Sequence, residues 1–195
     1  GTGGGGQTTG EELMGASGEL LTRWRALVGR LLALVCLWLA QPAPRWLAIG
    51  AGIAGAGLLL RGAAAGYLHK HEQLSTSGPY AYTRNPLYLG SALAAAGFLV
   101  ACRSWIAAAI LTAYFALFYP AVIRREEQEL RSLYGAAFDR YAARVPLFWP
   151  LRAAGGAAGG QRFSWAVYCR NREYQAALGF LAGVALLWLR MRWRG

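Results

Sequence analysis

Runs of apolar residues separated by short polar segments make up most of the chain. The first run, 24–40, ends at Gln41-Pro-Ala-Pro44, because proline cannot continue a helix and restricts the residue before it. A second run, 45–67, is rich in Gly and Ala, and small residues let membrane helices approach one another closely. The pattern predicts two membrane helices, the second packed by other helices on more than one side.

Two further apolar runs, 87–102 and 105–123, are separated only by Arg103-Ser104 and should pair as an antiparallel hairpin. Apolar residues at helical spacing continue beyond the second run as far as 145, with Pro120 as a kink and Gly135 as a point where the helix can be interrupted. The last helical stretch is 163–193. Its apolar core, 176–189, is short for a span of roughly 20 residues, so spanning should enlist part of the polar first half.

These runs predict an all-α, polytopic membrane helical bundle of about five transmembrane helices in a lipid bilayer. Composition supports this, since 56% of the residues are hydrophobic and only 15% are charged. The net charge of +11 comes almost entirely from arginines that flank the apolar runs. That placement is typical of cytoplasmic loops and of contact with anionic lipid, not of nucleic-acid binding. Arg190, Arg192 and Arg194 conflict with the resulting orientation.

Two glycine-rich segments divide the chain. Residues 1–20 are interpreted as a flexible tail and 153–160 as a linker, which leaves 21–195 as the membrane domain. No signal-peptide layout is seen. The three cysteines include no CxxC pair, and the two histidines, His69 and His71, are separated by one residue and have no further His or Cys beside them, so neither a disulfide framework nor a metal site is predicted.

Two polar clusters carry the candidate chemistry: SGPYAYTRNPLYLG at 77–90 and RREEQELRSLYGAAFDRYAARVPLFWP at 124–150. Because the hairpin turns at Arg103, both clusters lie at the same end of the bundle. Glu126 and Glu127 are adjacent, and on a helix consecutive side chains point about 100° apart. One can therefore pair with an arginine while the other faces the bundle, where a carboxylate needs a cation from the chain or from a ligand.

Together the clusters resemble the signature of the isoprenylcysteine carboxyl methyltransferase and phospholipid methyltransferase superfamily. The matching pieces are Ser77-Gly78-Pro79-Tyr80, Arg84-Asn85-Pro86-Leu87-Tyr88-Leu89-Gly90, Glu126-Glu127-Gln128-Glu129-Leu130, and Tyr134-Gly135 with Phe138, Tyr141, Val145 and Pro146. The resemblance covers about 68–150. It implies S-adenosylmethionine as methyl donor, held at the cytoplasmic end of the helices. Carried over by position, the donor-binding residues are Gln73, Leu74, Ser75, Tyr80, Asn85, Pro86, Leu87, Tyr88 and Glu126.

Two departures from the family pattern affect the expected substrate. Asn85 replaces a commoner histidine and cannot carry a proton near neutral pH. Val122 stands where the eukaryotic carboxyl methyltransferases have an arginine, so methylation of an isoprenylcysteine carboxylate is disfavoured. We expect transfer to a small lipophilic or lipid acceptor. Glu127 and Glu173 are candidates to take a proton from it, and Arg172 lies beside Glu173 in a polar stretch that can line the substrate pocket.

Plainer interpretations remain for each of these residues. Glu126 and Glu127 also fit a salt-bridged, solvated helix end, Tyr80 and Tyr88 fit aromatic side chains at the membrane interface, and 171–174 fits an interfacial anchor. A structural or transport-related membrane protein without catalytic activity is the alternative for the whole chain, although no inverted repeat is seen.

Overall fold

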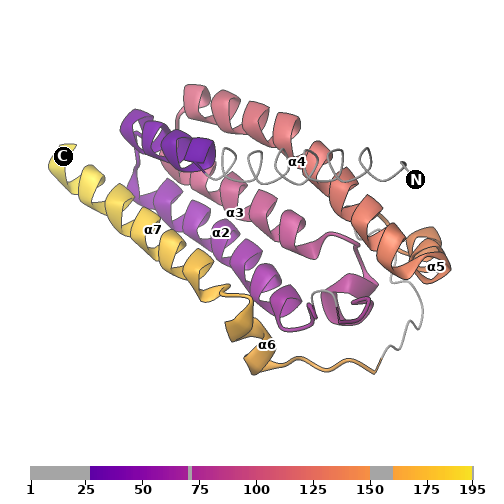
Figure 1. Cartoon of the computed structure of the whole chain (residues 1–195). Helices are drawn as coiled ribbons and strands as arrows, with labels where there is room; N and C mark the ends of the chain where they lie inside the picture. Colours follow the sequence, from indigo (N-terminus) through magenta and orange to yellow (C-terminus); the bar gives the residue numbers. More distant parts are fainter. Residues whose placement is uncertain (1–26, 70–71, 150–159, 195) are drawn as a thin grey trace, which may run out of the picture.

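The computed structural model describes residues 27–69, 72–149 and 160–194, and these contain helices and connections but no strand (Figure 1). The predicted tail 1–20 and nearly all of the linker 153–160 lie outside the described residues. In chain order the elements are a first helix (Leu27–Leu39), α2 (Pro44–Ala65), the 3₁₀ helix η1 (Gly78–Ala81), α3 (Pro86–Cys102), α4 (Trp105–Tyr134), α5 (Ala136–Arg144), α6 (Trp165–Arg170) and α7 (Tyr174–Arg194). The all-α prediction is confirmed.

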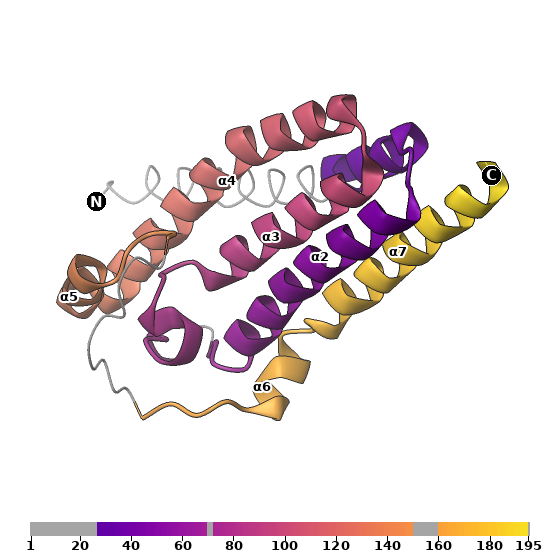
Figure 2. The same ribbon diagram turned by 180° about the vertical axis from the view of Figure 1, so that it is seen from behind.

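Helices α7, α2, α3 and α4 lie side by side in that order, as both views of the ribbon show (Figures 1 and 2). The end where α2 finishes and α3 starts also holds η1, α5 and α6, and is called the loop end below. The first helix packs at the opposite end, where Gln41 N donates to Cys102 O at 2.8 Å. Connectivity thus brings both polar clusters of the sequence to the loop end, as predicted.

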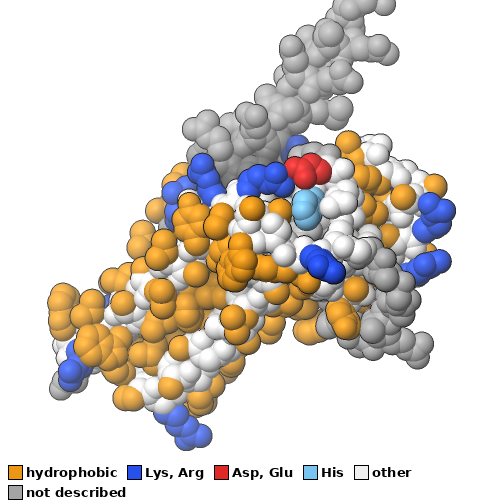
Figure 3. All heavy atoms as spheres, turned by 90° about the horizontal axis from the view of Figure 1, so that it is seen from below, with side chains coloured by type: hydrophobic (Ala, Val, Ile, Leu, Met, Phe, Trp, Pro, Cys, Tyr) orange, Lys and Arg blue, Asp and Glu red, His pale blue; other side chains and the backbone are white. Residues whose placement is uncertain are grey.

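Three helices are long and apolar enough to cross a membrane: α2 with 22 residues, α4 with 30, and 20 residues of α7. The described part of the first helix and α3, with 17 residues, are shorter apolar helices. Hydrophobic side chains cover most of the body of the bundle seen from below, whereas arginines lie near its ends (Figure 3). This is the surface expected of an integral membrane protein, because lipid replaces water around the apolar helix faces.

Helices α2 and α3 cross at a row of glycines. A Cβ atom added to Gly57 would lie 2.5 Å from the carbonyl oxygen of Gly90, and one added to Gly97 would lie 2.4 Å from that of Gly50. Neither distance leaves room for a methyl group, so the backbones touch there. α2 also contacts α7, α6 and η1, which confirms that this Gly-rich helix is packed on more than one side.

We therefore expect Gly57→Ala to destabilise the protein by about 1–3 kcal/mol, because the new methyl group must push two backbones apart. Gly55→Ala is the matched control, since nothing lies within 4 Å of its added Cβ and alanine favours the helix. Thermal unfolding in detergent measures both. Equal melting temperatures for the two variants would contradict the close crossing.

Helices α3 and α4 form the expected hairpin, but α3 packs much more closely on α2 than on α4. The turn is tight: Arg103 adopts a left-handed conformation (φ 51°), and the Ser104 hydroxyl caps α4 by accepting from Ala107 N at 3.3 Å. Gly135, with φ 49°, ends α4 and separates it from α5 as predicted. The sparse contact between α3 and α4 leaves room for the cavity described below.

The prediction of one helical stretch over 163–193 is wrong, because the chain forms two helices separated by 171–173. Arg172 is left-handed (φ 54°), and the Asn171 amide donates to Ala65 O at 2.9 Å and to Leu68 O at 3.0 Å. These bonds satisfy carbonyls at the end of α2 and fix the break. α7 starts after the break and is long enough to span by itself, so the polar first half is not needed for spanning.

Arg190 has a structural reason for its place near the end of α7. Its Nε donates to Ala40 O at 2.8 Å and its Nη2 donates to Trp38 O. These are carbonyls at the C-terminal end of the first helix, where the helix dipole favours a cation. This arginine therefore caps a neighbouring helix, which accounts for one of the three arginines that conflict with the predicted orientation.

Candidate active site

A cavity of about 570 Å³ opens at the loop end. Its walls come from the loop between α2 and η1, from η1, the first turns of α3, the middle and end of α4, α5, and Glu173 before α7. This volume lies within the range of roughly 300–1,000 Å³ that small-molecule sites occupy. The site is thus assembled from segments more than 100 residues apart in sequence, such as Arg61 and Glu173.

All nine predicted donor-binding residues line this cavity: Gln73, Leu74, Ser75, Tyr80, Asn85, Pro86, Leu87, Tyr88 and Glu126. Of the three predicted catalytic residues, Glu127 and Glu173 also line it. Arg172 does not; it is exposed and borders a separate hollow with Glu72, Arg170 and Asn171. The structure thus brings all but one of the predicted residues together, while their chemical roles stay predictions.

The loop before η1 is closed by the buried hydroxyl of Ser75. This hydroxyl donates to Tyr67 O at 2.9 Å and accepts from His69 N at 3.4 Å. From the other side, Gln161 receives a bond from Thr76 N at 3.3 Å and donates to Leu74 O at 3.2 Å. The loop is therefore held in shape by bonds to its own backbone and to a distant segment, which leaves a preformed wall.

Tyr80 is buried, with 7% of its surface exposed, and the hydroxyl of Tyr141 donates to its carbonyl oxygen at 2.8 Å. Burial raises the pKa of both phenols well above the ordinary value. Both side chains are therefore neutral at physiological pH and act as hydrogen-bond donors or aromatic walls, not as bases.

Asn85 is also buried, and its side-chain amide donates to Leu147 O at 3.0 Å. Next to this bond, Arg84 N donates to Pro146 O at 3.0 Å. The irregular segment that follows α5 therefore holds the start of α3 in place. Asn85 precedes Pro86 as the N-cap residue of α3 without a side-chain capping bond. The asparagine at this motif position thus has a clear positioning role.

Tyr88 and Glu126 bring the two sequence clusters into direct contact. The Tyr88 hydroxyl donates to Glu126 Oε1 at 2.6 Å, across the gap between α3 and α4. The Tyr88 ring meets Tyr119 edge to face, with centroids 5.3 Å apart. A carboxylate beside two aromatic rings is a suitable environment for a cationic group, because both the charge and the ring faces attract it.

Glu127 forms an ion pair with Arg84, whose Nη1 lies 3.1 Å from Glu127 Oε1. The pair does not satisfy either side chain completely. Arg84 Nε is buried and has no hydrogen-bond partner within the described structure, and Glu127 Oε1 is buried with an ion-pair contact to Arg84 Nη1 but no hydrogen bond there. Buried polar atoms are rarely left in this state without a functional reason, so this pair offers one donor and one acceptor to a bound molecule.

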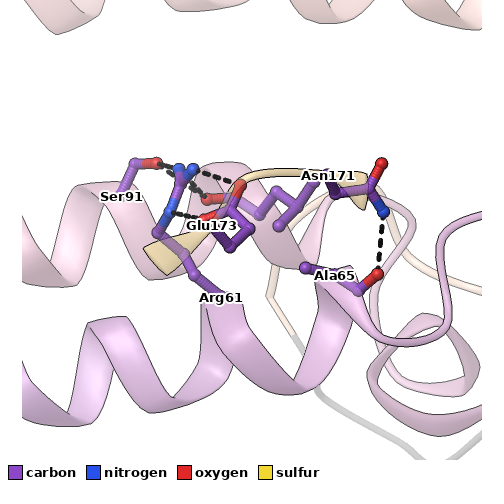
Figure 4. Close-up of polar contacts among 6 residues, drawn as sticks. Arg61, Ala65, Ser91, Asn171 and Glu173 are labelled. Carbon is purple, nitrogen blue, oxygen red and sulfur yellow. Dashed lines mark hydrogen bonds and ion pairs between the residues drawn. The ribbon is translucent and has the colours of Figure 1, made fainter. Parts of the chain in front are cut away.

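Arg61 and Glu173 form a second ion pair on the cavity wall (Figure 4). The guanidinium binds the carboxylate through two parallel contacts, Nε to Oε2 at 3.0 Å and Nη2 to Oε1 at 2.8 Å. Nη1 donates to Leu87 O at 3.3 Å and to the hydroxyl of Ser91. Glu173 is therefore held in place by α2, which in turn is tied to the first turns of α3.

Five residues that line the cavity were not predicted as site residues from the sequence: Arg61, Arg84, Ser91, Tyr119 and Tyr141. For Arg61 a signal existed, because a charge inside an otherwise apolar run is a functional candidate by default. Arg84 and Tyr141 belong to the motif pieces that carry the family resemblance. For Ser91 and Tyr119, only the folded structure shows that they line the cavity.

The helices and the cavity are those of an integral membrane protein with a polar pocket at one end of its bundle. Residues 57–137 match the family model of the phospholipid methyltransferases. The match includes the polar cluster 77–90 and the part of α4 that carries Glu126 and Glu127. Over this segment it confirms the resemblance recognised in the sequence.

Two curated proteins are similar to part of the chain. The cobalt-zinc-cadmium resistance protein CzcN of Cupriavidus metallidurans is 43% identical over 81 residues, which are 42% of this chain and 37% of that protein. The nickel-cobalt-cadmium resistance protein NccN of Alcaligenes xylosoxydans xylosoxydans is also 43% identical over 81 residues, covering 38% of its length. The match thus spans well under half of each relative. No solved structure matches the chain.

Proposed function

We propose that the protein is an S-adenosylmethionine-dependent membrane methyltransferase that acts on a small lipophilic or lipid acceptor. The observation that carries this proposal is the Tyr88–Glu126 contact at 2.6 Å inside a cavity that gathers every predicted donor-binding residue. The family match over 57–137 supports the same reaction class. We further propose that this end of the bundle faces the cytoplasm, where the arginine-rich loops belong.

The residues present fit the donor. The carboxylate of Glu126 suits an α-ammonium group, and the ring faces of Tyr88 and Tyr119 suit a sulfonium cation. Arg84 Nε, buried and without a hydrogen-bond partner in the described structure, can donate to a carboxylate. A cavity of about 570 Å³ has room for a nucleoside-sized ligand.

When bound, the donor supplies a methyl group attached to a positively charged sulfur. The acceptor takes this methyl group by in-line displacement of the sulfur. The chain has to align the two molecules and exclude water from between them. Tyr80 and Pro86, both buried, give the cavity a rigid wall. An acceptor that must lose a proton can pass it to Glu127, whose buried Oε1 is ion-paired with Arg84 Nη1 at 3.1 Å but makes no hydrogen bond within the described structure. Glu173 is less suited, because both of its oxygens accept from Arg61.

The test is methyl transfer by the purified protein. Protein in detergent is incubated with donor carrying a radiolabelled methyl group and with a membrane lipid extract, and the label is followed into separated lipid fractions. We expect one fraction to gain label with wild-type protein and none with the Tyr88→Ala/Glu126→Ala double variant. Label in no fraction, together with no calorimetric binding of the donor at millimolar concentration, would favour the structural or transport-related alternative.

The names of the two relatives place those proteins in resistance to cobalt, zinc, nickel and cadmium. Among the residues that the structure describes, no group of three or more His, Cys, Asp or Glu side chains lies together as a set of metal ligands. We therefore propose that any contribution of this chain to such a process proceeds through methyl transfer to an acceptor in the membrane.

A further inference from the structure

The charges on the cavity wall are arranged in an unusual way. The described lining residues include two arginines, Arg61 and Arg84, and four glutamates, Glu126, Glu127, Glu129 and Glu173. Each arginine is engaged by one of these glutamates, at 2.8 Å for Arg61–Glu173 and 3.1 Å for Arg84–Glu127. Both arginines of the described wall are therefore paired with carboxylates, although Arg84 keeps an Nε that has no hydrogen-bond partner within the described structure.

Of the two arginines, Arg61 has the larger share of its guanidinium nitrogens bonded to the protein. Its Nε and Nη2 bind both oxygens of Glu173, and its Nη1 binds Leu87 O and the Ser91 hydroxyl. The side chains of Arg61 and Glu173 are only 23% and 12% exposed, so water screens the pair weakly. A planar guanidinium whose three nitrogens all donate to the protein has little left to offer to an anionic ligand.

Within the described structure, the side-chain hydrogen bonds of Glu173 all go to Arg61. The break between α6 and α7 is fixed by Asn171, whose amide bonds to carbonyls at the end of α2. A neutral glutamine at 173 keeps the same length and can still accept a hydrogen bond from Arg61. It would, however, leave the charge of the guanidinium uncompensated inside the cavity.

From this arrangement we infer that Glu173 and Arg61 determine acceptor specificity: by neutralising Arg61, Glu173 makes the cavity reject acceptors whose reactive end is an anion. This inference rests on the proposed function, because it concerns which acceptors can reach the methyl group of the donor. Neutral and cationic ends are accepted, because neither needs a guanidinium that is free of its carboxylate partner.

The test uses three soluble probes with the same apolar skeleton: 4-phenylbutyrate, 4-phenylbutanol and 4-phenylbutylamine. Their binding to the full-length protein in detergent is measured by calorimetry without donor, and donor binding is measured separately. Wild-type protein should bind the alcohol and the amine at least about tenfold more tightly than the carboxylate. Glu173→Gln should raise affinity for the carboxylate by about tenfold or more, because Arg61 keeps its charge.

Two further variants make the result specific. Arg61→Gln/Glu173→Gln removes both charges and should abolish the gain, which separates a freed arginine from a general loosening of the site. Glu72→Gln is the matched control, because Glu72 pairs with Arg170 at 2.9 Å on the exposed surface and does not line this cavity. It should leave all three affinities unchanged.

Equal binding of carboxylate and alcohol by wild-type protein would overturn the inference, as would a Glu173→Gln variant that binds donor normally without gaining affinity for the carboxylate. Absence of binding by all three probes would overturn it too, since the cavity would then take no lipophilic acceptor. If the charge preference appears as expected while donor binding fails, the selectivity stands and the proposed methyl transfer falls.

Discussion

Replacing Glu126 by glutamine should reduce the affinity for S-adenosylmethionine by about 10- to 100-fold. A charge-assisted hydrogen bond contributes about 1.5–3 kcal/mol, and a glutamine keeps the size of the side chain while removing the charge. Because Tyr88 donates to Glu126 Oε1 at 2.6 Å, the carboxylate is held in place before any ligand arrives. Calorimetry in detergent measures the change directly.

Tyr88→Phe should have a smaller effect on donor affinity than Glu126→Gln. It keeps the aromatic ring beside Tyr119 but removes the hydroxyl, so the carboxylate loses its anchor and keeps its charge. We expect a loss of about tenfold, on the scale of one neutral hydrogen bond. Glu72→Gln serves as the charge control, since Glu72 pairs with Arg170 on the exposed surface and does not line the cavity. A donor affinity that is the same in all three variants would remove Glu126 from the site.

The second large effect concerns stability. Arg61→Met should destabilise the protein by about 3 kcal/mol, because it leaves the carboxylate of Glu173 buried without its cation. The estimate is taken at the low end of the range for buried pairs, since Arg61 is 23% exposed. Thermal or denaturant unfolding in detergent reports the loss.

The double variant Arg61→Met/Glu173→Met should recover most of this loss. Two apolar side chains of similar size replace the ion pair. The free-energy cost of removing both charges from water is nearly as large as the attraction between them, so little net stability is lost. Such recovery would show that the pair contributes little net stability, which is expected if it is kept for the charge of the cavity. A double variant as unstable as Arg61→Met would instead show that the bonds to Leu87 and Ser91 carry the stability.

Much of the candidate site could be predicted because its parts are local in sequence. The turn that precedes α3 and the two glutamates of α4 are short motifs, and the hairpin between them places both at one end by connectivity alone. Tyr88 and Glu126 are 38 residues apart and still meet directly. The high content of Gly and Ala in α2 likewise indicated close packing against other helices.

What could not be predicted depends on contacts between distant segments. Arg61 and Glu173 are separated by 112 residues, and no local pattern reports their pairing. The helix break at Arg172 depends on Asn171, which finds carbonyls at the end of α2, so tertiary bonds override a sequence with helical preference on both sides. The same applies to Asn85, whose partner Leu147 belongs to an irregular strip after α5.

The loop before η1 depends on residues near the far end of the chain, and this has a consequence for biosynthesis. Gln161 supplies bonds to Leu74 and Thr76, and Phe163 fills the space beside Gly66 so closely that an added Cβ would lie 2.1 Å from its ring. A ribosome releases these partners only after the helices up to α4 have been synthesised, and Glu173 emerges later still. A nascent chain therefore lacks the residues that hold this loop until its last part has been synthesised.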